Sequence, residues 1–513
     1  MTAKAVAIFG TSSDVGKSMI AAGLCRLLSR AGIRVAPFKA QNMSLNSFVT
    51  AEGGEIGRAQ ALQAEACGLP PHVDMNPILL KPESDCRSQL VVLGKVYGQL
   101  EASNYFEKGQ ELFRIVQESY ARLADQHDVM VIEGAGSAAE VNLRARDLVN
   151  WPVAHLADAQ VLLVADIDRG GVFAQVVGTL DLLQPEERVR VRGIIINKFR
   201  GDAGLFNDGI EILEARTGIP VVGVVPFLRD LTIDQEDSLD VNSSRKVKFG
   251  NDCVNIAVIL LPRMSNFTDF NALAAEPDVA LRYVSSPRDI FGADVVVIPG
   301  SKNTLGDLRY LEEKGFRAVC DAHVLANKEV IGICGGYQML GRKIADPYQV
   351  EQGGSMPGLG YLNIETVLRR DKRTTQVQAS PVGPFSSGHT TIQGYQIHMG
   401  VTTRVGDQPC FRIVSEAEAG NGSLPRDSPD EGQFDGAMNA NGCVWGTYIH
   451  GLFDQPTFRR FWLNSIRIRK GLPSLTEETS IAVNRRLHGE LDRWANHLEA
   501  HLRIGTLLKS LQS

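Results

Sequence analysis

A cysteine set among glycines stands where an apolar strand should turn into a helix, and it is the clearest candidate nucleophile of this 513-residue chain. Residues 330–333 form a short apolar run, Cys334 follows it, and Gly335 and Gly336 lead into a helical pattern. A sharp turn of this kind exposes the thiol, the glycines relieve crowding, and the helix N-terminus favours the thiolate. The pattern predicts a reactive cysteine, because such glycines have no purpose beside an inert core residue.

A thiol nucleophile needs a base, and two histidines are candidates. His450 follows another apolar run, 116 positions after Cys334 (450 − 334), whereas His398 lies in the run 394–400. We expect His450 to be the base, with His398 as the competing candidate. An imidazole base also needs a group that holds it in the right tautomer, and the sequence does not locate that group.

The order of Cys334 and His450 resembles that of the class I glutamine amidotransferases, which release ammonia from glutamine. Most members of that class carry a glutamate two positions after the histidine, where this chain has Leu452. Residues 299–303 follow a predicted strand and are similar to the loop that helps to form the oxyanion hole in this class. The resemblance implies that backbone N–H groups hold the oxyanion, namely those of Gly300 or Ser301 together with Gly335.

A glycine-rich loop near the N-terminus follows the first apolar run and precedes a helical pattern. Its end, Gly16-Lys17-Ser18, would admit phosphates, offer them the N–H groups of a helix N-terminus and add a positive charge. The strict motif has glycine at position 11, where this chain has Thr11, and this variant is similar to the loop of dethiobiotin synthetase. We expect ATP to bind through Gly10, Thr11, Asp14, Val15, Gly16, Lys17 and Ser18.

A magnesium ion usually accompanies a nucleotide at such a loop and prefers oxygen ligands. We expect Ser18 and Glu133 to hold it, because Glu133 stands at the carboxyl end of another predicted strand; Asp166 also ends a strand and is the alternative acid. Asn197 follows a further apolar run. We predict that Asn197 contacts adenine, since an amide can both donate to and accept from a purine edge.

Two series of β-branched runs, alternating with helical patterns, must position these residues, and each predicts a parallel sheet covered on both faces. The first series predicts a doubly wound P-loop domain over residues 1–230. Between residues 229 and 252 the apolar period fades, so we place the domain boundary there. The second series predicts a doubly wound α/β amidotransferase domain over residues 252–458, with antiparallel strands inserted between residues 366 and 435, and residues 459–513 are expected to form a C-terminal helical extension.

The bulk composition excludes several classes of protein. A net charge of −6 argues against sequence-independent nucleic-acid binding, which uses a basic face. The cysteines include no C-x-x-C pair, so the sequence predicts neither a disulfide framework nor a zinc site. The first residues lack the layout of a signal peptide, and no apolar run is long enough to span a bilayer. We therefore expect a soluble, cytoplasmic protein with no nucleic-acid or membrane partner.

Several further segments resemble the cobyrinate-amidating enzymes of cobalamin biosynthesis, which join a dethiobiotin synthetase-like half to a class I amidase half. The resemblance spans residues 5 to about 455 and includes the runs 38–44, 74–82, 165–173, 197–202, 236–238 and 262–269. It implies amidation of the b, d, e and g carboxylates of a corrinoid, adenosylcobyrinic acid a,c-diamide, with ATP, Mg²⁺ and glutamine. Since a carboxylate does not react with ammonia at a useful rate, we expect an acyl phosphate and a cysteine thioester as intermediates.

Polar residues just beyond predicted strand ends are candidates for holding the corrinoid carboxylates, because ligands collect there in open α/β sheets. They are Gln41, Asn42, Arg144, Arg146, Arg169 and Arg200. Two alternatives stay open, namely the same chemistry on other side chains, as in cobyrinic acid a,c-diamide synthase, and a non-enzymatic P-loop switch with an inactive amidase domain. The intact cysteine turn and His450 count against the switch.

Overall fold

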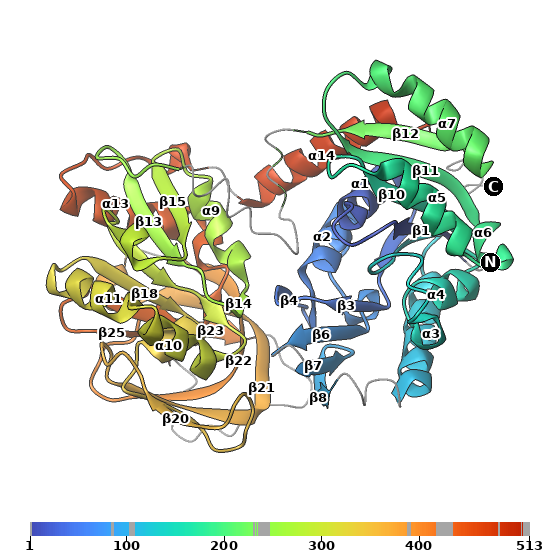
Figure 1. Cartoon of the computed structure of the whole chain (residues 1–513). Helices are drawn as coiled ribbons and strands as arrows, with labels where there is room; N and C mark the ends of the chain where they lie inside the picture. Colours follow the sequence, from blue (N-terminus) through green and yellow to red (C-terminus); the bar gives the residue numbers. More distant parts are fainter. Residues whose placement is uncertain are drawn as a thin grey trace.

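The computed structural model places two α/β domains side by side (Figure 1). It describes residues 3–83, 87–101, 108–228, 231, 233, 247–386, 391–416, 434–480, 483–503 and 505. The first domain is coloured blue to green in Figure 1, and the second is mostly yellow to orange. Each is built on a largely parallel sheet with helices on both faces, which confirms the predicted fold class.

A six-stranded parallel sheet forms the centre of the first domain, in the order β12-β11-β10-β1-β9-β2. Its strands are buried almost throughout, because helices cover both faces and each face has its own apolar core. The loops after β1 and β9 leave the same edge of the sheet side by side, since these two parallel strands are neighbours. The strands are β1 (Lys4–Gly10), β2 (Val35–Phe38), β9 (Val129–Glu133), β10 (Gln160–Asp166), β11 (Val191–Phe199) and β12 (Val221–Pro226). The helices are α1 (Lys17–Arg30), α2 (Arg58–Cys67), α3 (Gly109–Ala124), α4 (Trp151–Leu156), α5 (Val172–Leu182), α6 (Pro185–Arg188) and α7 (Asn207–Thr217).

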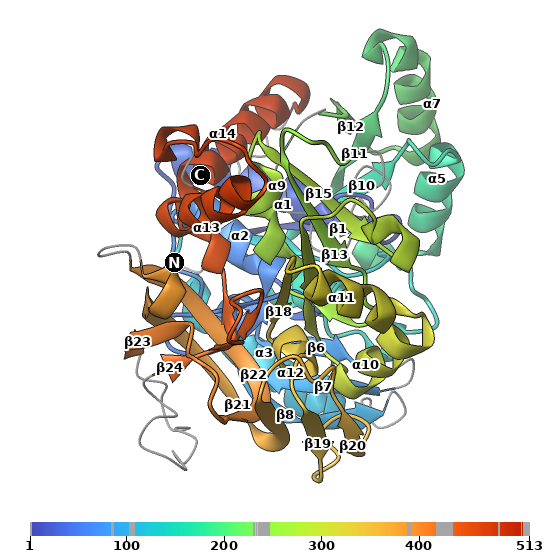
Figure 2. The ribbon, with the colours of Figure 1, turned by 90° about the vertical axis from the view of Figure 1, so that its left-hand side faces the viewer.

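Two small sheets, which the sequence did not predict, lie between β2 and α3 in the chain. In Figure 1 they extend from the first domain toward the second, and Figure 2 shows strands of the second domain crossing in front of them. One has the order β3-β6-β7-β8, and the other pairs β4 with β5. Their bounds are β3 (Gln41–Met43), β4 (Ser47–Val49), β5 (Glu55–Gly57), β6 (Ile78–Pro82), β7 (Arg87–Val92) and β8 (Lys95–Glu101).

The second domain has its own six-stranded sheet, in the order β15-β13-β16-β18-β26-β25, of which only the β25–β26 pair is antiparallel. Its strands are β13 (Val254–Ile259), β15 (Val279–Val284), β16 (Val295–Ile298), β18 (Glu329–Ile333), β25 (Ala437–Met438) and β26 (Val444–Thr447). The helices around it are α9 (Asn271–Ala274), α10 (Thr304–Glu313), α11 (Phe316–Leu325), α12 (Gly335–Met339) and α13 (Pro456–Arg469).

The strands expected between residues 366 and 435 form part of a mostly antiparallel sheet on this domain. Its long hairpin, β21 and β22, faces the small sheets of the first domain in Figure 1. The strands are β19 (Lys343–Asp346), β20 (Gly354–Pro357), β21 (Ile364–Pro381), β22 (Ile392–Arg404), β23 (Phe411–Glu416), β24 (Phe434–Asp435) and β27 (Ile449–His450). Short strands β14 (Met264–Ser265) and β17 (Gly300–Ser301) pair beside it.

The segment 459–513, predicted as one helical extension, is divided between the two domains. Helix α13 packs against β13 of the second domain, whereas α14 (Val483–His501) returns to the first domain and packs on α1 and β12 (Figure 1). Trp494 Nε1 donates to the carbonyl of Met19 at 2.7 Å, and a Cβ on Gly23 would lie 2.3 Å from Leu498. The first domain is therefore completed by a helix from the far end of the chain.

The predicted domain boundary falls mostly outside the described residues, since of the stretch 229–252 the structure describes only residues 231, 233 and 247–252. On either side of it, β12 ends the first sheet and β13 begins the second. Among the described residues, no helix has the length and apolarity that crossing a membrane requires.

Candidate functional site

The P-loop connects β1 to α1 at the carboxyl edge of the first sheet. Gly16 has a φ of +99°, and a Cβ there would lie 2.3 Å from Asn197 Nδ2, so the position requires glycine. The Lys17 ammonium donates to the carbonyl oxygens of Ser12 at 3.0 Å and Gly136 at 2.9 Å. These contacts hold Lys17 against the loop, where a phosphate would bind.

The other residues predicted to bind ATP gather around the same loop. Gly10 ends β1 and Thr11 follows it, while Asp14 adopts a left-handed conformation with a φ of +59°. Asn197 is 4% exposed, and its Nδ2 donates to the carbonyl of Val15 at 2.8 Å. Asn197 therefore supports the loop directly, and its contact with adenine stays a prediction.

Glu133 lies at the end of β9 beside the loop and is 1% exposed. Its Oε1 accepts hydrogen bonds from Ser18 Oγ at 2.7 Å and Lys39 Nζ at 2.8 Å. Its Oε2 accepts from Gln63 Nε2 at 2.6 Å. Burial would raise the pKa of this carboxyl, but the positive charge of Lys39 and the hydrogen bonds lower the pKa below its usual value. The carboxylate is therefore ionised at neutral pH.

Ser18 and Glu133 fit a hard divalent cation, because a hydroxyl and a carboxylate oxygen lie 2.7 Å apart. Within the described residues, no group of three or more His, Cys, Asp or Glu side chains could hold a metal ion. A magnesium site at a nucleotide does not need such a group, since phosphates and water complete its shell. Asp166, the alternative acid, pairs with Lys198 Nζ at 2.9 Å.

Arg169 and Arg200, two candidates for substrate binding, are exposed near the P-loop. Arg169 pairs with Asp14 of the loop at 3.3 Å, and its side chain is 61% exposed. Arg200 pairs with Asp168 at 2.6 Å and is 50% exposed. Their position suits contact with an anionic substrate next to the nucleotide, and that role stays a prediction.

The other four candidates for substrate binding lie in different surroundings. Gln41 and Asn42 belong to β3, where Asn42 is buried. Arg144 and Arg146 belong to the 3₁₀ turn after β9, and Arg146 is exposed. Arg144 pairs with the buried Glu187 of α6 at 3.0 Å, which gives it a structural role.

Cys334 stands at a strained turn between β18 and α12, with a φ of +51° and a ψ of −106°. The glycines around it are required by close contacts, because a Cβ on Gly332 would lie 2.6 Å from Gly336 and one on Gly336 would lie 1.9 Å from the carbonyl oxygen of Ile298. The thiol donates to the carbonyl of Ile397 at 3.5 Å. Strain of this kind is typical of functional turns and matches the geometry of a nucleophile elbow.

His450 is fully buried, and Asp269 orients it. His450 Nδ1 lies 2.7 Å from Asp269 Oδ2, and the Gly451 N–H donates to Asp269 Oδ1 at 2.9 Å. Burial alone would lower the pKa of His450, but the carboxylate of Asp269, assisted by the Cys334 thiol, raises the pKa to about 10. Asp269 is thus the group that holds the imidazole tautomer, which the sequence did not locate.

One signal in the sequence points to Asp269. It ends the run 262–269, which follows the strand β13 and resembles the cobyrinate-amidating enzymes. The spacing alone does not indicate that Asp269 contacts His450, since Asp269 lies 181 positions before His450 in the chain. Only the folded chain brings the two side chains together.

His398, the competing base, has surroundings unlike those of His450. It lies on β22, its Nδ1 contacts the carbonyl of Gly400 at 2.8 Å, and its ring stacks on Tyr448 at 3.7 Å. Burial, followed by the nearby charge of Arg373, lowers the pKa of His398 to about 3. Among the residues that the structure describes, no carboxylate accepts a hydrogen bond from this ring, so His398 is poorly suited to accept a proton from the thiol.

The predicted oxyanion donors lie next to the cysteine. Gly335 is the first residue of α12, and a Cβ on it would lie 2.8 Å from the Ser301 backbone nitrogen. Gly300 and Ser301 form β17, and a Cβ on Gly300 would lie 3.5 Å from His450 Cε1. The backbone nitrogen of Ser301 therefore lies close to Gly335, next to Cys334, and the role of both N–H groups as an oxyanion hole stays a prediction.

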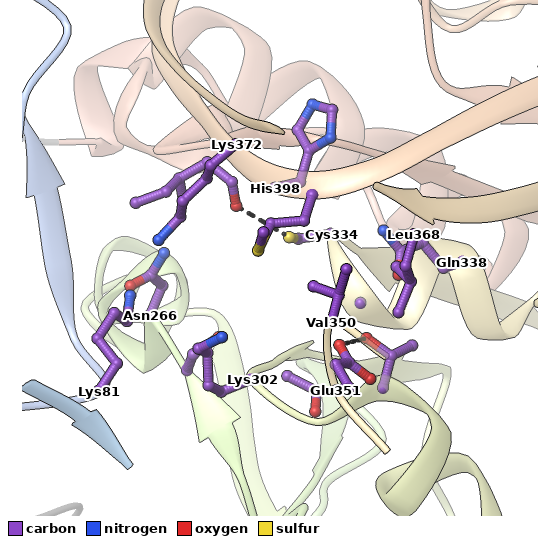
Figure 3. A pocket seen from close by; sticks show the side chains of 16 residues that line it. Lys81, Asn266, Lys302, Cys334, Gln338, Val350, Glu351, Leu368, Lys372 and His398 are labelled. Carbon is purple, nitrogen blue, oxygen red and sulfur yellow. Dashed lines mark hydrogen bonds between the residues drawn. The ribbon is translucent and has the colours of Figure 1, made fainter. Parts of the chain in front are cut away.

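A pocket lies beside Cys334 where the two domains meet (Figure 3). Lys81 reaches it from β6 of the first domain, whereas Lys302, Glu351 and Lys372 come from the second. Burial raises the pKa of Glu351 to about 7 and lowers the pKa of Lys372 to about 7. The pocket thus offers charged groups of both signs to a small zwitterion at the thiol.

Buried ion pairs join the domains around this pocket. Glu55 of β5 is 1% exposed and accepts from Lys81 at 2.5 Å and from Lys372 of the second domain. Glu83 pairs with Lys302 across the same interface at 2.8 Å. Because a buried charge without its partner is costly, these pairs fix how the domains meet.

Family models match the chain in two consecutive stretches that coincide with the two domains. Residues 6–240 match the CobQ/CobB/MinD/ParA nucleotide binding domain, and residues 255–458 match the CobB/CobQ-like glutamine amidotransferase domain. With the P-loop and the cysteine site described above, these matches define a glutamine amidotransferase fused to a nucleotide-binding domain.

Curated relatives identify the family. The cobyric acid synthase of Dehalococcoides mccartyi (strain CBDB1) is 48% identical over 92% of this chain and 92% of its own length. That of Sorangium cellulosum (strain So ce56) is 48% identical, with 98% of this chain and 97% of the relative covered. That of Klebsiella pneumoniae (strain 342) is 46% identical, with 98% and 96% covered. The chain belongs to the cobyric acid synthase family of glutamine-dependent amidotransferases.

Proposed function

We propose that this enzyme amidates the b, d, e and g side-chain carboxylates of adenosylcobyrinic acid a,c-diamide, using ATP and glutamine. The observation that carries the proposal is the presence, in one member of this family, of a P-loop with Ser18 beside Glu133 and of a strained cysteine beside an oriented histidine. The first site would activate a carboxylate with ATP, and the second would release ammonia from glutamine. Together the two activities amount to the synthesis of an amide.

The first step activates the substrate. A carboxylate oxygen of the corrinoid attacks the γ-phosphorus of ATP, the bond to ADP breaks, and an acyl phosphate forms. Lys17 at the loop neutralises the charge that develops on the transferred group. Magnesium, which Ser18 and Glu133 would hold, supplies further charge neutralisation at the phosphates.

The second step makes ammonia. His450 holds the thiol proton, because Asp269 raises the pKa of its imidazole to about 10, and the Cys334 thiolate attacks the carbonyl carbon of the glutamine side-chain amide. The backbone N–H groups of Ser301 and Gly335 stabilise the oxyanion, and Asp269 stabilises the imidazolium. The amide nitrogen leaves as ammonia with the proton from His450, and water then hydrolyses the thioester to glutamate. Ammonia displaces phosphate from the acyl phosphate, so each corrinoid amide costs one ATP and one glutamine.

Analysis of the corrinoid product tests which substrate the protein amidates. The protein is incubated with adenosylcobyrinic acid a,c-diamide, MgATP and glutamine, and the corrinoid is analysed by mass spectrometry. Conversion of four carboxylates to amides supports the proposal. In a parallel incubation with cobyrinic acid, activity confined to the a and c carboxylates would favour the a,c-diamide synthase. An unchanged corrinoid without glutamate release in either incubation would favour the switch.

Two variants test the division of labour. Cys334→Ala should lose synthesis from glutamine but retain ATP-dependent synthesis from ammonium salts, with a rate that rises with pH because only unprotonated ammonia attacks. Lys17→Ala should abolish synthesis from either nitrogen source, because phosphoryl transfer needs the positive charge. Retention of ammonia-dependent activity by Lys17→Ala would contradict the activation step.

A further inference from the structure

The loop that carries Ser301, a predicted oxyanion donor, is paired with the loop that follows β13. Strands β17 and β14 form a short antiparallel pair, in which Ser301 stands opposite Met264. Successive positions of such a pair alternate between hydrogen-bonded and non-hydrogen-bonded ones. Because the backbone N–H of Lys302 donates to the carbonyl of Arg263 at 2.9 Å, the position of Ser301 is a non-hydrogen-bonded one. The backbone N–H of Ser301 therefore points away from β14.

Two hydrogen bonds fix the side chain of Ser301. The backbone N–H of Asn303 donates to Ser301 Oγ at 2.9 Å. Since an N–H group can only donate, the hydroxyl accepts there, and it donates its single proton to Asp307 Oδ2 at 2.6 Å. A Cβ on Gly335 would lie 2.8 Å from the Ser301 backbone nitrogen. The hydroxyl contacts thus hold Ser301 in one orientation, with its nitrogen beside the residue that follows Cys334.

Asp307, in the first turn of α10, contacts both loops at once. Its side chain accepts the Ser301 hydroxyl proton and also the backbone N–H of Arg263, which lies 3.3 Å from each carboxylate oxygen. Asp307 is 2% exposed, and burial raises its pKa to about 6, so the carboxyl is ionised at pH 8. Arg263 belongs to the loop that leads to Asp269, the residue that orients His450. One buried carboxylate therefore joins the loop of the predicted oxyanion donor to the loop of Asp269.

We propose that Asp307 is a positioning residue for glutamine hydrolysis, which fixes Ser301 so that its backbone N–H faces the oxyanion of the tetrahedral intermediate. Ser301 lines the pocket beside Cys334, and Asp307 acts on it through the hydroxyl. The strength of an oxyanion donor depends on its distance and direction, so a small rotation of Ser301 would slow hydrolysis and leave the thiolate unchanged. The inference rests on the proposed function, since it assumes that Cys334 hydrolyses glutamine.

Two reactions of Cys334 distinguish this role from a structural one. Glutamine hydrolysis places negative charge on a carbonyl oxygen and therefore needs the oxyanion donors. Alkylation by iodoacetamide needs only the thiolate, because the sulfur bonds to the methylene carbon, the carbon–iodine bond breaks and iodide leaves. Both are measured on the full-length protein at pH 8. Glutamate release is followed with MgATP and the corrinoid present, and alkylation is followed on the Cys334 peptide by mass spectrometry.

Asp307→Ala should separate the two reactions. We expect kcat for glutamate release to fall at least about tenfold, since removal of a whole oxyanion donor costs about 10²–10³-fold. The KM for glutamine and the rate of alkylation should stay within about twofold of the wild-type values, because the lost interaction belongs to the transition state. Synthesis from ammonium salts should continue. Asp269→Asn should instead slow both reactions, because Asp269 stabilises the imidazolium that accompanies the thiolate.

The conservative variant Asp307→Asn should recover most of kcat. Its amide oxygen can occupy the position of Oδ2, which accepts from both the Ser301 hydroxyl and the Arg263 N–H. Glu313→Ala, on the exposed side of the same helix, is the matched control and should leave hydrolysis and alkylation unchanged.

Ser301→Ala keeps the test decisive if Asp307→Ala folds poorly. It removes the hydroxyl through which Asp307 acts and leaves α10 intact, so it should also lower kcat and retain the rate of alkylation. The double variant Ser301→Ala/Asp307→Ala should be no slower than the slower single variant, because both substitutions interrupt one contact.

Three results would overturn the proposal. They are a wild-type kcat in Asp307→Ala, an equal fall of hydrolysis and alkylation in both single variants, and losses that add in the double variant. Absence of glutamate release from the wild type, with MgATP and the corrinoid present, would instead contradict the proposed function.

Discussion

The two histidines beside Cys334 differ in what surrounds them. His450 has a carboxylate at Nδ1, and the pKa of its ring rises to about 10 because Asp269 more than offsets the effect of burial. His398 has a backbone carbonyl at Nδ1, and the pKa of its ring falls to about 3, chiefly because of burial. The identity of the base therefore depends on the neighbours of each imidazole and not on its distance along the chain.

Replacing Asp269 tests this assignment. Asp269→Asn keeps the size of the side chain but removes the charge that stabilises the imidazolium and fixes its tautomer, so kcat for glutamine hydrolysis should fall by about 10²–10⁴-fold. Synthesis from ammonium salts should continue, because the P-loop site is untouched. Steady-state glutaminase and ammonia-dependent assays on the same preparation provide the comparison. Full glutaminase activity in this variant would exclude Asp269 as the orienting group.

His398 should affect acid stability more than catalysis. Because its pKa in the folded protein is about 3 and that of an unfolded histidine is near 6.5, the unfolded chain binds one more proton between these values. The stability that neutral His398 contributes is present above about pH 6.5 and is lost as the pH falls toward 3.

The variant His398→Gln should remove this dependence. Relative to the wild type, its free energy of unfolding should improve by up to about 1 kcal/mol for each pH unit below 6. Urea denaturation at several values between pH 7 and 4.5 measures the difference. Parallel pH profiles for the two proteins, or loss of glutaminase activity in a folded His398→Gln variant, would contradict the prediction.

Sequence patterns could predict those parts of the sites that lie next to each other in the chain. The P-loop and the turn at Cys334 are local motifs whose glycines have a steric purpose, so their residue types and spacing suffice. Asp269 lies 181 positions before His450 in the chain, and only the packing of the segment after β13 brings the two side chains together. The role of Asp269 could not be read from spacing.

At the scale of elements, the sequence predicts the C-terminal helix but not the domain on which this helix packs. The period of apolar residues between 483 and 502 predicts an amphipathic helix, and the structure has α14 there. The pattern shows that one face is covered but not which domain covers it. The structure places this face on α1 and β12, where Leu498 is fully buried and Asp492 pairs with Arg26 at 2.8 Å.

Helix α14 should therefore contribute to the stability of the nucleotide-binding domain. Leu498→Ala leaves a cavity against Gly23 of α1 and should lower the free energy of unfolding by about 2–5 kcal/mol. Chemical denaturation should measure the lower free energy of unfolding, and the affinity for ATP should also be lower. The matched control is Glu499→Ala on the exposed face of the same helix, which should change stability by less than about 0.5 kcal/mol. Equal effects of the two variants would show that α14 is not part of this core.

At the scale of the whole molecule, the described elements follow one another from one domain to the other at two places. One lies between β12 and β13, and the other lies between α13 and α14. The domains also meet through the buried pairs of Glu55 with Lys372 and of Glu83 with Lys302. These contacts bring the cysteine site to the small sheets that the sequence did not predict, because long-range pairing and not local pattern forms those sheets.

Limited proteolysis tests this arrangement. We expect the first cleavage between residues 229 and 252, where the apolar period fades, yet the two fragments should stay together on size-exclusion chromatography. The reason is that the C-terminal fragment carries α14, whose Trp494 and Leu498 pack on α1 of the N-terminal fragment. Separate elution of the fragments in native buffer would contradict this packing.

A second cut distinguishes the contribution of α14 from that of the domain interface. A protease site inserted among the largely exposed residues 471–480 allows the chain to be cut at both places in one protein. The short fragment that begins near residue 481 should then co-elute with residues 1 to about 240, since its apolar face belongs to the core of the first domain. If that fragment instead followed residues 252–470, or eluted alone, α14 would have to be assigned to the second domain or to neither.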